Sequence, residues 1–130
     1  MRFEEKKPPR RFTVGMDKQI TISDCGDIYL NHNEQVTFKT QDGKEYDLAK
    51  KDWGYYATPS LNGRLEQFNL RGVLVKNMVS KRYFVLLVER GKEPEFEEYL
   101  KEEQLKIITW MDNSDVLNNL EQKLKQVNNG

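Results

Sequence analysis

The residues best suited to chemistry lie together in one short segment of the chain. Three aromatic side chains there offer faces on which a sugar or a base can stack. Two hydrogen-bonding side chains follow, and then an arginine, whose planar cation suits carboxylate or phosphate. The segment predicts a small pocket for an anionic or sugar-bearing ligand, and the alternative is a capped helix whose aromatic residues fill the core. The candidate ligand-binding residues are Trp53, Tyr55, Tyr56, Ser60, Asn62 and Arg64.

A helix over residues 58–69 is expected to position these groups. Thr58-Pro59 is typical of a helix start, with a hydroxyl cap followed by proline at the first helical position. Leu61, Leu65 and Phe68 then recur at helical spacing. The free N–H groups and the positive partial charge of a helix N-terminus bind anions, so the ligand is expected at the start of this helix.

Other reactive residue types are isolated. His32, the one histidine, lies between two asparagines in a predicted turn, and the sequence shows no partner that would orient it as a base. Cys25, the one cysteine, has Asp24 and Asp27 nearby, and their charges disfavour a reactive thiolate. We therefore expect no catalytic residue, metal or cofactor. The alternative is a small enzyme acting on a sugar or sugar phosphate, with Tyr55, Tyr56 and Arg64 acting beside His32.

Charge balance argues against a general affinity for polyanions. The 130 residues include 21 basic and 21 acidic ones, so the chain lacks a global positive field. The run Lys6–Arg11 is a local exception, and nucleic-acid binding through it is a further alternative. Its two prolines do not support ladder pairing, so residues 1–11 are expected to form a flexible basic arm.

Several absences suggest a cytoplasmic protein. The chain has no paired cysteines, an N-terminus too charged for a signal peptide, and no apolar run of about 18 residues that could span a membrane.

Period-two patterns in the first half predict an antiparallel meander. Apolar and polar residues alternate over 19–23, 28–30, 35–40 and 44–49. Asp42-Gly43 is typical of a tight hairpin turn, and Asp24 to Asp27 has the composition of another.

The second half predicts strands at 71–76, 83–88 and 106–110, with a helix opening at Glu93-Pro94 and burying Phe96, Tyr99 and Leu100. The nearly continuous apolar run 83–88 indicates a central strand. Together with 44–49 and 58–69, this order matches the split βαβ arrangement, βαββαβ, of ferredoxin-like domains. The predicted fold is α+β: an N-terminal meander, a ferredoxin-like core within one domain at 12–112, and a C-terminal amphipathic helix.

Residues 113–130 are expected to form that final helix and a frayed end. Asp112 to Asp115 offers capping oxygens, and an apolar seam follows. Two heptads are too few for an independent coiled coil, so the helix docks on its own domain, or pairs with a twin or another protein. The seam consists of Leu117, Leu120, Leu124 and Val127.

Three runs also carry a resemblance to known sequences. Trp53 to Leu65, Leu74 to Asn77 and Leu87 to Lys92 resemble an uncharacterised family of small bacterial proteins that accompany surface-polysaccharide or modified-sugar biosynthesis. The resemblance covers most of residues 1–112. It implies a sugar-linked ligand or partner and no particular mechanism.

Overall fold

The computed structural model describes residues 1–57 and 59–129, and all structural statements concern these residues. Helices and strands follow one another in this order: β1 (Arg2–Val14), β2 (Ile20–Tyr29), β3 (Gln35–Lys39), β4 (Glu45–Lys51), β5 (Gly54–Tyr56), α1 (Arg64–Gln67), β6 (Leu70–Asn77), β7 (Tyr83–Glu89), α2 (Glu93–Glu102), β8 (Leu105–Trp110) and α3 (Ser114–Asn129).

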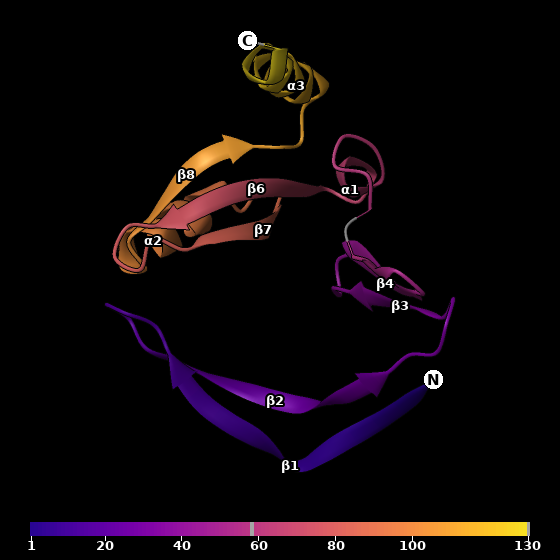
Figure 1. The fold of residues 1–130 in the computed structure, drawn as a ribbon. Helices are drawn as coiled ribbons and strands as arrows, with labels where there is room; N and C mark the ends of the chain where they lie inside the picture. The colour runs from indigo at the N-terminus through magenta and orange to yellow at the C-terminus, as the bar shows by residue number, and fades with distance from the viewer. Residues whose placement is uncertain (58, 130) are drawn as a thin grey trace.

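The strands form three antiparallel sheets (Figure 1), with the orders β1-β2, β3-β4-β5 and β7-β6-β8. The predicted α+β class, N-terminal strands and C-terminal helix are confirmed. From β4 onward the chain also follows the expected order of strands and helices. The pairing differs from a split βαβ sheet, because both edges of β4 are occupied by its sequence neighbours β3 and β5. Local hairpins close shorter loops than a crossover does, and they leave a three-stranded sheet from β6 to β8.

Strand β1 corrects the expectation of a flexible arm over residues 1–11. The register pairs residues 2–5 and then 10–14 with β2, and it is interrupted in between. Pro8 and Pro9 fall in this interruption, so their missing N–H groups cost only a local gap in the ladder. The turn predicted at 24–27 is also wrong, because β2 continues through it. At Gly26 a Cβ would lie 2.5 Å from the Glu4 carbonyl oxygen and 2.7 Å from the Phe3 ring, so the close approach of the partner strand explains this glycine.

The turn at Asp42-Gly43 is confirmed. It joins β3 to β4, and Gly43 has a φ of 93°, which glycine adopts without strain. The Thr40 N–H donates to the Lys44 carbonyl at 3.0 Å and closes the hairpin.

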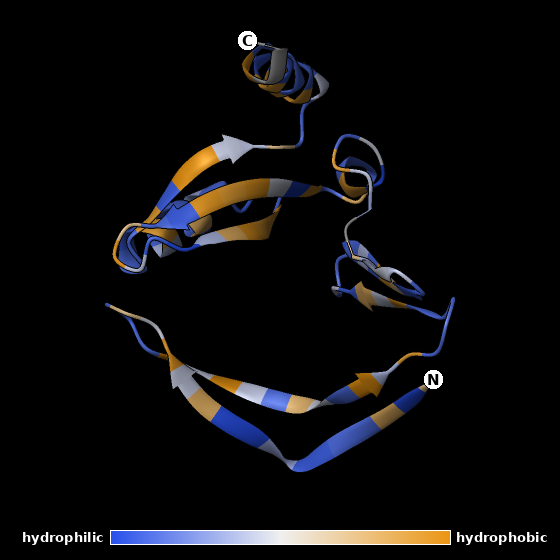
Figure 2. Ribbon diagram, in the orientation of Figure 1, coloured by the Kyte–Doolittle hydropathy of each residue, from blue (hydrophilic) through white to orange (hydrophobic). Residues whose placement is uncertain are grey.

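The core lies on one face of the β7-β6-β8 sheet. Val73 and Val75 of β6, Val88 of β7 and Leu100 of α2 form its buried cluster. Figure 2 shows the corresponding apolar segments on these strands. Phe96 of α2 meets Trp110 edge-on at 5.9 Å between ring centroids, as expected for the buried side of this helix. The sheet is therefore covered by α2 on this face, which we call the core face.

The strand predicted to be central, 83–88, is an edge strand, and β6 is the central one. Tyr83, Phe84 and Val85 of β7 are exposed. Register places Val85 beside Leu74, on the side of the sheet opposite the core face. We call this side the second face, and its incomplete cover explains the exposure of Tyr83 and Val85.

None of the helices described here has the length and apolar composition needed to cross a bilayer.

Candidate functional site

The helix expected at 58–69 is reduced to the single turn of α1. Gly63 has φ −139° and ψ −92°, which is outside helical geometry and ends the helix on its N-terminal side. The Ser60 side chain accepts the Arg64 N–H at 2.7 Å, and the Ser60 carbonyl accepts the Leu65 N–H at 3.1 Å. Thr58, the predicted cap, lies outside the described residues. One turn provides no helix terminus of the kind that binds anions, so this premise of the predicted site is wrong.

Arg64 pairs with a buried acid. Its Nε donates to Asp47 Oδ2 at 2.7 Å, and the Thr37 hydroxyl donates to Asp47 Oδ1 at 2.8 Å. Asp47 is only 5 % exposed, so its charge needs this compensation. The guanidinium also lies over the Phe68 ring, 5.2 Å from its centroid. Arg64 is thus first a partner of Asp47, although its Nη atoms have no hydrogen-bond partner within the described residues.

The three aromatic residues do not fill the core. Trp53, in the β4–β5 turn, is 70 % exposed, and both tyrosines are exposed as well. Register places Tyr56 beside Ala49, on the same side of β4 as Asp47, and Tyr55 on the opposite side. Asn62 donates to the Ser114 hydroxyl of α3 at 3.1 Å. The six predicted ligand residues therefore lie on different surfaces instead of converging on one pocket.

An exposed apolar surface begins at α3. Asn113 Oδ1 accepts the Asp115 N–H at 2.7 Å, so the predicted capping oxygens do start this helix. Asp112, just before it, is held by Arg71 through Nε at 2.7 Å and lies 3.7 Å from Arg90. The Arg71 guanidinium also lies 3.9 Å from the Trp110 ring centroid. This cluster holds the start of α3 next to the end of β8.

Sequence reasoning missed the cluster of Arg71, Arg90, Trp110 and Asp112. No local spacing links Arg71 to Asp112, which are 41 residues apart. Its one sequence signal is a charged residue just before an apolar run, since Arg71 precedes Val73 to Val75 in β6.

Beyond its first turn, α3 turns its apolar seam toward solvent. The exposed fraction rises along the helix from 37 % at Val116 to 55 % at Leu124 and 77 % at Val127. Figure 1 shows α3 standing away from the sheet and joined to it through the end of β8. Self-docking is therefore confined to the first half of the helix, where Leu120 and Ile108 of β8 line one hollow, and Leu124 and Val127 are the most exposed residues of the seam.

Two hollows continue this apolar surface. The first, of about 370 Å³, lies between β8 and α3, and Ile108, Val116 and Leu120 contribute its apolar lining. The second, of about 470 Å³, is lined chiefly by Pro59, Leu61, Val85 and Met111, with Ser60 at its side. The second hollow includes Val85 of the second face. We call the seam, the two hollows and the second face together the association surface.

The remaining predicted residues are apart from this surface. His32 is exposed in the β2–β3 connection and lines neither hollow, so no cavity described here unites it with Tyr55, Tyr56 and Arg64. Cys25 is exposed on β2, and its thiol donates to the Ser23 carbonyl at 3.5 Å.

The basic run of β1 is partly neutralised by ion pairs. Lys6 lies 2.6 Å from Asp24 Oδ2 and Arg10 lies 3.3 Å from the same atom. The hydrogen bond from Lys6 is the main cause that lowers the pKa of Asp24 below its usual range. Within the described residues, no three histidine, cysteine or acidic side chains gather as metal ligands would.

Comparison with protein-family models finds no match, and comparisons with curated proteins and with solved structures find none either.

Proposed function

We propose that this chain is a non-catalytic accessory protein that works as a homodimer and pairs through the association surface. Its binding contacts, and not a reaction, would then be its contribution. The observation that carries this proposal is the extent of exposed surface, together with the apolar character of α3 and the second face.

The accessible surface of the single chain is 9434 Å². A folded monomer of its mass, 15.4 kDa, is expected to expose about 7,200 Å². The excess of about 2,200 Å² lies within the range that each partner of an obligate homodimer buries, about 1,000–2,500 Å². A second copy can therefore cover an area of the size that this open shape leaves exposed.

Charge favours a second copy over a charged partner. In a two-fold contact the same patch meets itself, so a patch with net charge repels its twin. Along α3, Asp115 and Glu121 balance Lys123 and Lys125, and the whole chain carries a formal net charge of zero. On α3 itself, net charge therefore does not oppose contact of the apolar seam with its twin.

Sedimentation velocity across a concentration series tests the proposal. We expect the wild-type chain to sediment at twice the monomer mass, and Leu124→Glu to give a monomer with an unchanged circular dichroism spectrum. Gln122→Glu introduces the same charge on the same helix away from the seam, and should leave the dimer intact. A wild-type chain that stays monomeric at about 100 µM, well above the dissociation constants of stable dimers, would overturn the proposal.

We propose, as a second candidate, that the β4–β5 turn binds a sugar-bearing anion. Trp53 and Tyr55 are exposed and offer stacking faces, and the Nη groups of Arg64 would donate hydrogen bonds to an anion on the Tyr56 side of the sheet. Because Tyr55 and Tyr56 lie on opposite sides, such a ligand would use Trp53 with one of them. A sugar-linked ligand is also what the resemblance to polysaccharide-associated proteins implies.

Tryptophan fluorescence with UDP-glucose and glucose 1-phosphate tests this candidate. Saturable quenching that Trp53→Phe abolishes and Tyr83→Ala, an exposed aromatic on another sheet, leaves intact would support it. Quenching that persists in Trp53→Phe arises at Trp110 and would contradict the candidate, as would the absence of any saturable response.

A further inference from the structure

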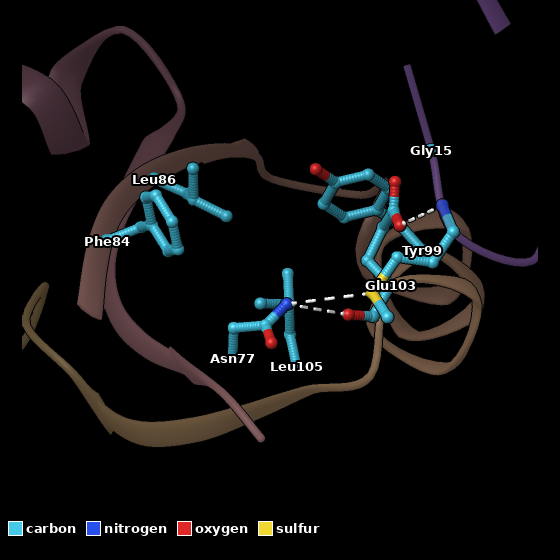
Figure 3. Close-up of a pocket in the computed structure, with 8 residues that line it drawn as sticks. Gly15, Asn77, Phe84, Leu86, Tyr99, Glu103 and Leu105 are labelled. Atoms are coloured by element: carbon cyan, nitrogen blue, oxygen red, sulfur yellow. Dashed lines mark hydrogen bonds between the residues drawn. The ribbon is translucent and has the colours of Figure 1, made fainter. Parts of the chain in front are cut away.

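A cavity of about 330 Å³ lies between α2, the core face of the sheet and the tip of the β1–β2 hairpin (Figure 3). It is separate from the association surface and from the β4–β5 turn. The residues that line it are Gly15, Met16, Asn77, Phe84, Leu86, Tyr99, Glu103 and Leu105.

The cavity exists because α2 covers only part of the core face. The helix packs toward β8, where Phe96 meets Trp110, and its end is held by Asn77, whose Nδ2 donates to the Glu103 carbonyl at 3.1 Å. On the edge strand β7, Phe84 pairs with Val75 and so shares the core face. It nevertheless remains 44 % exposed. The uncovered end of the core face forms the apolar wall of the cavity.

The hairpin tip closes the cavity on its other side. The Met16 N–H donates to Glu103 Oε2 at 2.8 Å, and the Asp17 N–H donates to the Glu102 carbonyl at 3.2 Å. Gly15 shapes the tip, because its φ is 118° and a Cβ there would lie 2.0 Å from the Lys18 carbonyl oxygen. Two backbone N–H donors thus hold a segment far away in sequence over the end of α2.

The polar groups of the lining select one kind of ligand. The amide oxygen of Asn77 accepts the N–H groups of Val79 and Ser80, so it is fully occupied. The Tyr99 hydroxyl has no hydrogen-bond partner within the described residues, and Glu103 uses only Oε2. Glu103 is the one charged residue in the lining, so a carboxylate or phosphate would meet repulsion there and an ammonium would meet attraction.

We infer that this cavity binds a small amphipathic amine, with its apolar body against Phe84, Leu86 and Leu105 and its ammonium group at Glu103 and Tyr99. The volume falls at the lower end of ligand pockets, about 300–1,000 Å³. Burial of the apolar body would complete the cover of the core face, and the carboxylate would give the site its preference for a cation.

Titrations with n-hexylamine, hexanol and hexanoate, followed by saturation-transfer NMR, test this inference. We expect saturable binding of the amine at least tenfold tighter than that of hexanoate. Glu103→Gln keeps an acceptor for the Met16 N–H and should remove the preference for the amine while hexanol binding persists. Glu98→Gln, an exposed acid on the same helix, should change neither.

Equal binding of hexanoate, an unchanged preference in Glu103→Gln, or no saturable binding of any probe would overturn the inference. The same titrations on monomeric Leu124→Glu keep the two proposals apart, because the cavity lies within one chain. Failure of dimerisation would therefore leave the amine site intact, and failure of the amine site would not affect the dimer.

Discussion

At the scale of single residues, Arg64 stabilises the fold by pairing with Asp47, in addition to being a candidate ligand residue. A carboxylate that is 5 % exposed depends on its two partners, the Arg64 guanidinium and the Thr37 hydroxyl. Loss of the cation leaves a buried charge without compensation, which is costlier than losing both charges together. Any loss of ligand binding on substitution of Arg64 must therefore be separated from loss of stability.

Arg64→Ala should lower the free energy of unfolding by about 2 kcal/mol, a value below the usual cost of breaking a buried pair because Arg64 is itself half exposed. Asp47→Asn should rescue most of this loss in the double variant, since asparagine keeps the Thr37 hydrogen bond without a buried charge. Urea denaturation of the two single variants and the double variant measures both effects. Additive losses in the double variant would show that the pair is not coupled.

The sequence could not predict this pair. Asp47 lies in a strand of alternating polar and apolar residues, where an acid usually faces water. Arg64 is 17 residues away, and the β4–β5 turn, β5 and the segment that leads to α1 lie between them. By contrast, the cap of α3 was predictable, because Asn113 and the N–H it accepts are two residues apart. Contacts within about four residues can be read from local spacing, whereas a contact such as that between β4 and α1 depends on how distant elements pack.

At the scale of elements, ion pairs to the Asp24 carboxylate help to hold the β1–β2 hairpin together. Lys6 and Arg10 meet Asp24 beside the interruption in the ladder, where backbone pairing is absent. Lys6, Arg10 and the Gly26 N–H lower the pKa of Asp24. A carboxyl group whose pKa is lower in the folded state than in the unfolded one stabilises the fold above its ordinary pKa, about 3.9, and the stabilisation is lost as the pH falls below that value.

Acid should therefore open this hairpin before the rest of the chain. Below about pH 4 we expect the amide of Gly26 to lose its downfield NMR shift in step with protonation of Asp24, while the amides of β6 are unchanged. Asp24→Asn should remove the titration. A Gly26 amide that follows the same pH curve in Asp24→Asn would assign the transition to another group.

The predicted helices and strands are wrong where the local residue composition and the surrounding structure favour different conformations. Asp24 to Asp27 has the composition of a turn, yet it remains in β2 because the partner strand continues past it and Phe3 packs on Gly26. The stripe of Leu61, Leu65 and Phe68 indicated three turns of helix, but Gly63 departs from helical geometry and leaves one. Asp42-Gly43, where turn composition lies between two paired strands, was predicted correctly.

At the scale of the whole molecule, the chain has more apolar side chains than its own core buries. In the described part, its buried apolar side chains are Pro59, Leu65, Leu70, Val73, Val75, Val88 and Leu100. Fold class followed from periodicity, because alternation and helical spacing are local properties. Sheet pairing did not, because β4 has two local partners that compete with the distant β6. The association surface was visible in sequence only as the seam of α3, since the second face and the hollows exist only once β6 to β8 have paired.

The docked tip of the β1–β2 hairpin also limits how this protein can vary. Insertions in hairpin turns are usually tolerated, because a turn in solvent can lengthen freely. The turn at Gly43 is of that kind, since a Cβ there would meet nothing within 4 Å. The tip at Gly15 to Asp17 is different, because it must reach Glu102 and Glu103. The length of the hairpin therefore sets the position of its tip: one residue added to or deleted from each strand moves the tip by about 3.4 Å along the strands and breaks its hydrogen bonds to Glu102 and Glu103. Length variation in natural or designed versions of this chain should therefore accumulate at the β3–β4 turn and spare the longer hairpin.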